Sequence, residues 1–350
     1  MKNRHTLTAR KISLFEIIFS LFLLIFGVTT ICSLIIFFIY FIYASGFFLL
    51  IFLWPIAVGL AIGIFKSNIK PFEIEINERD NPKLKEVIDD LIQKTGMKRP
   101  TKIVLKENSQ VAVTGFFRKK IIIGMVSLKF LEKEELVCIL AHEYGHFAHR
   151  DTLIGYFIWR IEYFFDVQEK FNKSSLNFDL MAIIYCPTFC FFWLLNNFFK
   201  LTSLWYSRRI ELRADSFAAR IVGKQEYANA FMKYVSMSEI FERVVPQHII
   251  RYLREGLVIK NIYAYLTPVY TEENIRTALE ISLSRKSGFF DSHPSESERL
   301  ENIRISEINL IFKNNLSNLL HNQEKLEEKE SELFTQKMTN IIPLSFRYQG

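Results

Sequence analysis

The feature that most constrains this chain is a long uncharged stretch near its N-terminus. From Ile17 to Tyr43 no residue is charged, and a helix needs only about 20 apolar residues to cross a bilayer. A second uncharged run, residues 47–65, follows a turn of three small residues. The first run is longer than the roughly 7–15 residues of a signal-peptide core. We therefore expect an N-terminal transmembrane hairpin within residues 1–66, with spans at about 12–43 and 47–65.

The charges around these runs predict their orientation. The turn between them carries no charge, whereas both outer flanks are basic, with Lys2, Arg4, Arg10, Lys11, Lys66 and Lys70. By the positive-inside rule, both flanks and the region that follows lie in the cytoplasm. The formal net charge of +7 is not gathered in one basic tract, so we expect the lipid bilayer as a partner and no nucleic acid.

A second apolar block follows the central region of the chain, at residues 152–165 and 181–206. The first segment contains Arg160 and Glu162, and the second contains polar residues such as Asn196. Such residues are costly inside a bilayer. These segments therefore either form a second pair of spans or pack against protein.

The region between the N-terminal runs and the second block has the patterns of a globular domain. A helix is expected from Pro82, which suits the first helical turn, to Gly96, which suits a helix end. Residues 101–107 alternate like a strand, and residues 110–126 have the pattern of a β-hairpin. The acidic stretch at 132–135 suits the start of a further helix. We therefore predict an α+β fold that is mainly α-helical, with a helical core and a small β-sheet.

The helix after residue 132 carries the stretch His142-Glu143-Tyr144-Gly145-His146. Residues four apart lie about 40° apart around a helix and about 6 Å apart along it, so both imidazoles can reach one metal ion. This is the HExxH pattern of zinc peptidases, in which the two histidines bind Zn²⁺ and the glutamate is the general base. The alternative is a helix whose histidines are ordinary polar side chains.

A catalytic zinc needs a third protein ligand. His149 lies roughly 10 Å along the helix from His142, so we expect it to be a polar neighbour. Residues 208–220 are predicted to form a second helix, on which Glu211 and Asp215 share one face. A glutamate from a second helix is the gluzincin solution, and an acid one turn later can orient a ligating histidine. The alternative is a solvated face on which arginines pair with these acids.

One more group of residues lies far along the chain, where His293-Pro294 is followed by Arg299. A histidine or arginine from a distant segment can stabilise the oxyanion that forms during peptide hydrolysis. Together with HEYGH at 142–146 and ELRAD at 211–215, these residues resemble a membrane zinc peptidase family. That family contains the type I CaaX-processing endopeptidase and the bacterial heat-shock protease HtpX.

This resemblance implies an integral membrane protein with a gluzincin-type zinc protease domain over residues 67–310 and one Zn²⁺ per chain. The site residues that it implies are the zinc ligands His142, His146 and Glu211, the base Glu143, the supporting acid Asp215, and His293 with Arg299 near the reacting carbonyl. Residues 311–350 match no motif of the family, and we expect an exposed, charged helix or tail there.

The resemblance also implies where a substrate binds. Proteins of this kind often carry NAFATG in an edge strand that binds substrate by strand addition, and the matching stretch here is QVAVTG at 110–115. Backbone pairing does not depend on those side chains. We therefore expect a polypeptide substrate to pair with Val111, Ala112, Val113 and Thr114.

The two halves of the zinc site also constrain the topology. Because His146 and Glu211 must meet at one ion, the chain between them crosses the membrane an even number of times. We expect four spans, as in HtpX-like proteins, in a bacterial-type cell or inner membrane, with the site facing the cytoplasm.

The expected function is that of a membrane-bound zinc endopeptidase that acts on unfolded or membrane-proximal proteins. The alternatives are a processing peptidase of narrow specificity, or a membrane scaffold with a vestigial zinc site. The natural substrate and the oligomeric state do not follow from the sequence.

Overall fold

The computed structural model describes residues 14–45, 74–115, 119–148, 158, 161, 163, 166, 179–255, 257, 259–288, 291, 293–305, 308 and 317–341. The chain divides into two compact units. One comprises residues 1–71, 149–210 and 288–293, and the other comprises residues 72–148, 211–287 and 294–350. Each unit has its own apolar core.

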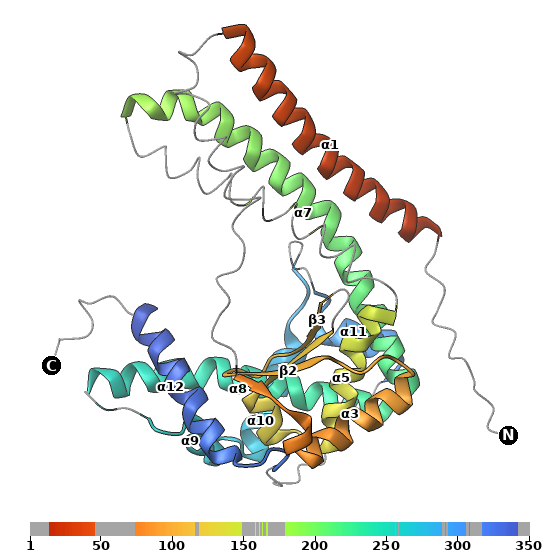
Figure 1. Ribbon diagram of the computed structural model, residues 1–350, viewed down its shortest axis with the longest axis vertical. Helices are drawn as coiled ribbons and strands as arrows, with labels where there is room; N and C mark the ends of the chain where they lie inside the picture. Colours follow the sequence, from red (N-terminus) through yellow and green to blue (C-terminus); the bar gives the residue numbers. More distant parts are fainter. Residues whose placement is uncertain are drawn as a thin grey trace. The chain divides into compact units, whose positions relative to one another are not determined.

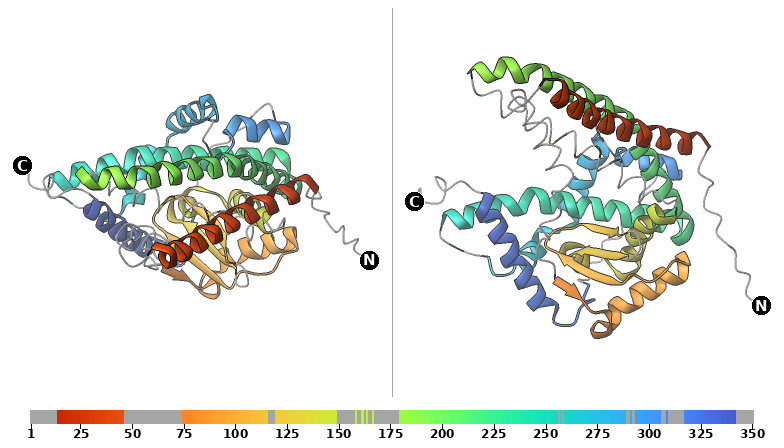
Figure 2. Two further views of the ribbon diagram at one scale, coloured as in Figure 1. Left: turned by 90° about the horizontal axis from the view of Figure 1, so that it is seen from above. Right: turned by 45° about the horizontal axis from the view of Figure 1, so that its top comes forward.

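The first unit is built on two long helices, α1 (Leu14–Ser45) and the first part of α7 (Asp179–Val222), which run side by side in Figures 1 and 2. Aromatic side chains join them: the ring of Phe19 packs edge-on against Trp205, with the two centroids 5.0 Å apart. Among the described residues of this unit, Leu23, Ile158, Ile161, Phe199 and Tyr206 form a buried apolar cluster.

Helix α1 also presents large apolar side chains to the surroundings. Those that are exposed are Ile18, Leu21, Phe22, Ile25, Val28, Ile36 and Tyr40. In the part of the chain that the structure describes, no helix combines the length and the apolar character needed to cross a bilayer. The expected second span at 47–65 and most of the segment at 152–165 lie outside the described residues.

Helix α7 unites two stretches that the sequence patterns treat separately. It runs without interruption from Asp179 to Val222, so the apolar segment at 181–206 and the predicted helix at 208–220 are parts of one element. The expectation of a helix at 208–220 is confirmed. Its last part belongs to the second unit.

The second unit contains a four-stranded sheet in the order β1-β2-β4-β3. The strands are β1 (Ile74–Ile76), β2 (Lys102–Lys106), β3 (Val111–Thr114) and β4 (Lys120–Gly124). Strands β2 and β4 are parallel, whereas β1 and β3 pair antiparallel with their neighbours. Both the expected strand at 101–107 and the expected hairpin are confirmed, and β3 lies at an edge of the sheet.

Helices make up most of the rest of the second unit. They are α3 (Pro82–Thr95), α4 (Met125–Phe130), α5 (Lys133–Ala148), α8 (Lys224–Arg254), α9 (Ile262–Leu266), α10 (Glu272–Ser284), α11 (Glu296–Ile303) and α12 (Gln323–Ile341), with short 3₁₀ turns at Glu78–Asp80 and Thr267–Val269. Helix α3 ends as predicted, because Gly96 adopts φ +67° and its N–H closes the last turn on Ile92.

Helix α5 is the central element of the second unit. It contacts α3, α8 and strand β3. The residues from Leu136 to Ala141 are all buried, so the helix has apolar neighbours around most of its circumference. An element held on several sides suits a functional site, because packing fixes the rotamers of the side chains that it carries.

The C-terminal region differs from the expected exposed helix or tail. Helix α12 packs on α8 and α9, and its Glu327 is 3% exposed. Lys129 of α4 donates to Glu327 over 2.7 Å, and the side-chain amide of Asn261 donates to the same carboxylate over 2.9 Å. The charged sequence of α12 therefore includes a buried face, on which Lys129 and Asn261 from distant segments bind the carboxylate of Glu327.

Glu330 lies on the same face of α12, and it forms no ion pair with a cation among the residues that the structure describes. It is 2% exposed, and burial together with the negative charge of Glu107 raises its pKa from 4.5 to about 7, although Lys337 opposes the shift. Folding therefore favours the protonated carboxyl. Its contribution to stability is fully present below about pH 4.5 and is lost as the pH rises through 7.

Replacing Glu330 by glutamine should remove this pH dependence. The variant should gain stability relative to the wild type as the pH rises from about 5 to about 8, by on the order of 2 kcal/mol. Urea unfolding at the two pH values measures the difference. Glu332→Gln, at an exposed position of the same helix, is the matched control. Parallel pH profiles for Glu330→Gln and the wild type would contradict the assignment.

Candidate metal centre

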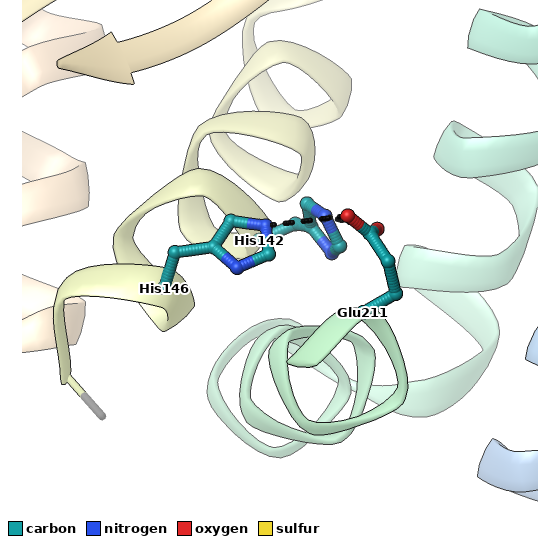
Figure 3. A group of neighbouring side chains, drawn as sticks. All are labelled: His142, His146 and Glu211. Atoms are coloured by element: carbon teal, nitrogen blue, oxygen red, sulfur yellow. Dashed lines mark ion pairs between the residues drawn. The ribbon is translucent and has the colours of Figure 1, made fainter. Parts of the chain in front are cut away.

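Three side chains from two helices meet in the second unit. His142 and His146 project from α5, and Glu211 projects from α7 (Figure 3). One ligand atom from each residue lies within 4.8 Å of the others. The Nε2 atoms of His142 and His146 lie 3.4 Å and 3.8 Å from the carboxylate oxygens of Glu211. Two imidazoles and a carboxylate in this arrangement are a donor set that suits a divalent transition metal.

A glycine allows the two helices to approach this closely. A Cβ atom on Gly145 would lie 3.0 Å from the Cα and 3.2 Å from the carbonyl oxygen of Ala214. Both neighbouring atoms belong to the backbone of α7, so they cannot rotate away. The pair of small residues, Gly145 and Ala214, therefore sets the distance between the histidines and the helix that carries Glu211.

The orientation of His142 is fixed from behind by a buried acid. Oδ1 of Asp215 lies 2.9 Å from Nδ1 of His142, and Asp215 is 0% exposed. A carboxylate at Nδ1 accepts the ring hydrogen there and leaves the lone pair on Nε2, the nitrogen that faces Glu211. His142 is thereby held in the tautomer that can bind a metal through Nε2.

A tyrosine that the sequence analysis did not identify completes this arrangement. The hydroxyl of Tyr227, from α8, donates to Oδ1 of Asp215 over 2.5 Å and lies 3.1 Å from Nδ1 of His142. The ring of Tyr227 stacks on Phe231, one turn later on α8, as expected of an ordinary core residue. Nothing in the local sequence indicates that its hydroxyl reaches an acid on another helix.

Arg299, from α11, provides the positive charge that pairs with Asp215. Its Nε and Nη2 atoms donate to the two oxygens of Asp215 over 2.9 Å and 2.6 Å, and its guanidinium lies 4.2 Å from the ring centroid of Phe231. A fully buried carboxylate requires such a counter-charge. The Nη2 atom also lies 3.5 Å from Oε2 of Glu211, so the guanidinium stands beside the metal-ligand candidates as well as Asp215. Its expected place near a reacting carbonyl stays a prediction.

The other expected residues are placed as follows. Glu143 lies on α5 next to His142, and Val111 to Thr114 form the edge strand β3. His293 belongs to the first unit, whereas His142, His146, Glu211, Asp215, Tyr227 and Arg299 belong to the second. His149 lies outside the described residues.

The electrostatics of the cluster favour a cation. Burial disfavours a charged His142, but hydrogen bonds to Asp215 and Glu211 outweigh burial and raise its pKa to about 9. Burial raises the pKa of Asp215 less than Arg299 and His142 lower it, so its pKa falls to about 2. The carboxylates thus attract positive charge to the point where the ligand atoms converge.

The pKa values of the other two motif residues, His146 and Glu143, are shifted toward the neutral form. Burial and the charge of His142 lower the pKa of His146 to about 4, so its imidazole keeps a free lone pair at neutral pH. Burial raises the pKa of Glu143 to about 7, although the charge of His142 and a backbone hydrogen bond from Val113 oppose the shift. Glu143 can therefore exchange a proton near neutral pH.

A helix with two histidines and an intervening glutamate, completed by a glutamate from a second helix, is the ligand arrangement of zinc metallopeptidases. A comparison with known families agrees with that class. The model of peptidase family M48 matches residues 78–307, which is more than half of the 350 residues. The chain belongs to peptidase family M48.

Several curated relatives are named as homologues of the protease HtpX. The one from Methanocaldococcus jannaschii is 25% identical over 231 residues, which cover 59% of this chain and 77% of the relative. The one from Archaeoglobus fulgidus is 22% identical over 276 residues, or 75% of this chain and 79% of the relative. The one from Janthinobacterium sp. (strain Marseille) is 24% identical over 158 residues, and the match covers 52% of its length.

A solved structure, the crystal structure of S. mikatae Ste24p, also resembles this chain, with a TM-score of 0.43 and 16% identity. The match covers 83% of this chain and 66% of that chain.

Gly145→Ala should disturb the metal centre through the backbone of α7. The added methyl group forces the two helices apart, which should cost about 1–3 kcal/mol of stability and weaken zinc binding. Gly145→Ser adds one more atom and should have the larger effect on both quantities. Chelator competition measures the zinc affinity, and thermal unfolding measures the stability. Wild-type zinc affinity in both variants would show that this crossing does not position the ligands.

Proposed function

We propose that the protein is a zinc-dependent endopeptidase that cleaves peptide bonds of unfolded or membrane-proximal proteins. The observation that carries this proposal is the convergence of His142, His146 and Glu211 within 4.8 Å, with Glu143 on the same helix as the two histidines. Membership of peptidase family M48 supports the reaction class.

The residues fit one Zn²⁺ per chain. His142 and His146 would hold it through neutral imidazoles and Glu211 through its carboxylate, while Asp215 and Tyr227 keep His142 in place. When bound, the ion lowers the pKa of water and polarises a carbonyl. Glu143 then takes the proton from water on its carboxylate and delivers it to the leaving nitrogen.

The edge strand supplies a surface for the substrate. Strand β3 is the last strand of the sheet and contacts α5, the helix that carries Glu143. We propose that a polypeptide pairs with the outer side of β3, because main-chain hydrogen bonds give affinity with little dependence on sequence. His293 remains a proposed contributor to oxyanion stabilisation, and the activity of His293→Ala tests it.

We also propose that the chain is anchored in a membrane, with the site on the cytoplasmic side. The uncharged run from Ile17 to Tyr43 and the exposed apolar side chains of α1 support membrane attachment. The basic flanks support the orientation. Extraction with carbonate, compared with extraction with detergent, tests the anchoring.

Two substitutions test the roles of the metal-site residues. Glu143→Gln should retain one zinc per chain and lose cleavage by at least about 100-fold, because the base is removed while the ligands remain. Glu211→Ala should lose both zinc and cleavage. Zinc content and casein cleavage of the detergent-purified protein measure these outcomes.

Glu134→Gln, which changes an exposed glutamate at the start of α5, is the control and should behave as the wild type. Zinc retained in Glu211→Ala would contradict the ligand set. A zinc-loaded wild type that cleaves no casein and no peptide would instead support a scaffold, whereas cleavage of short peptides alone would support a processing peptidase of narrow specificity.

A further inference from the structure

The register of β3 determines which of its backbone groups face the free edge. The N–H of Gly124 donates to the carbonyl of Gln110 over 2.6 Å, so these two residues form a hydrogen-bonded pair. Hydrogen-bonded and non-hydrogen-bonded pairs alternate along an antiparallel ladder. Val111 pairs with Ile123 and Val113 with Ile121 in the non-hydrogen-bonded positions, so the N–H and C=O groups of both valines point away from β4.

Both outward N–H groups have partners next to the metal centre. The backbone N–H of Val113 interacts with Glu143 and lowers the pKa of its carboxyl. The N–H of Val111 points at the hydroxyl oxygen of Tyr234, from α8, over 3.4 Å. The outward carbonyls of Val111 and Val113 are acceptors, so the edge as it stands offers a peptide acceptors but no direct backbone donor at these two residues.

The hydroxyl of Tyr234 occupies the backbone N–H of Val111, and it can itself donate a hydrogen bond in place of that N–H. It accepts from Val111, and a hydroxyl that accepts with a lone pair still has its hydrogen to donate. Ser238, one turn further along α8, donates to the backbone carbonyl of Tyr234, and a side-chain hydrogen bond from Ser238 also lowers the pKa of the phenol, so Ser238 acts as a donor in both contacts. Burial and the charge of Glu143 raise the pKa of Tyr234 to about 12, so the phenol keeps its proton at neutral pH.

We propose that Tyr234 is a substrate-positioning residue, whose O–H donates to a backbone carbonyl of the peptide that lies along β3. This inference rests on the proposed endopeptidase function and specifies how its substrate is held. The carbonyl lies about two residues along the peptide from the bond beside Glu143, since Val111 and Val113 are two residues apart on β3. The N–H of Val111 thus donates to the Tyr234 hydroxyl, and the hydroxyl donates to the substrate backbone. Binding therefore requires no particular substrate side chain at that position.

The test is Tyr234→Phe on the full-length, zinc-loaded protein with a cleaved peptide. Losing one hydrogen bond to the substrate should raise KM by about 3- to 10-fold and leave kcat and zinc content unchanged. Tyr270→Phe is the matched control, because the Tyr270 hydroxyl is buried and donates to the carbonyl of Met237. That control should lower the melting temperature and leave KM unchanged.

A second measurement separates positioning from a structural effect. In a series of peptides, each carbonyl outside the cleaved bond is replaced in turn by a methylene group. One replacement, about two residues from the cleaved bond, should raise KM in the wild type and have little further effect in Tyr234→Phe. If Tyr234→Phe does not fold, the peptide series on the wild type decides. A KM that is unchanged when that carbonyl is replaced would overturn the proposal.

The outcomes are distinct from a failure of the proposed function. A wild type that cleaves nothing refutes the endopeptidase itself. Two results overturn the role of Tyr234 while leaving the endopeptidase function intact. The first is an active wild type whose KM lies within twofold of that of Tyr234→Phe. The second is an increase in KM from the carbonyl replacement that is the same in Tyr234→Phe as in the wild type.

Discussion

The rest of the site depends on the hydrogen bonds made by the buried carboxylate of Asp215. It is 0% exposed, and it receives hydrogen bonds from Arg299 of α11 and Tyr227 of α8 while its Oδ1 lies 2.9 Å from Nδ1 of His142 on α5. A lone ion at this depth would be strongly destabilising, so its partners must be in place when the unit folds. One charge thereby ties four helices together and orients a metal ligand.

This arrangement separates the residues that hold the site from the residues that react. Arg299 and Tyr227 donate hydrogen bonds to Asp215, and Gly145 allows the close spacing of α5 and α7. Glu143 is left beside the ligands, with a backbone hydrogen bond from the edge strand. The base and the substrate-binding strand are therefore connected directly, because the same valine that faces the free edge also contacts the base.

The local parts of this fold could be predicted from the sequence because short-range rules govern them. Pro82 and Gly96 mark the ends of α3, and the alternation at 110–126 predicts the β3–β4 hairpin. The burial of Glu327 and Glu330 on α12 could not be predicted, since the charged sequence of that helix is typical of a solvated one. Lys129 neutralises the charge of Glu327, and Asn261 donates a hydrogen bond to it. Both residues lie in segments distant from α12.

The same division applies to the metal centre. The sequence alone determined that His142 and His146 share a helix face, because the helical period requires it at a spacing of four. It also determined that Glu211 and Asp215 share a face of a second helix. Only the tertiary structure decided that the two faces meet, that Arg299 binds Asp215, and that the hydroxyls of Tyr227 and Tyr234 reach an acid and a strand edge. Contacts between helices depend on packing between residues far apart in the chain, and no local periodicity encodes them.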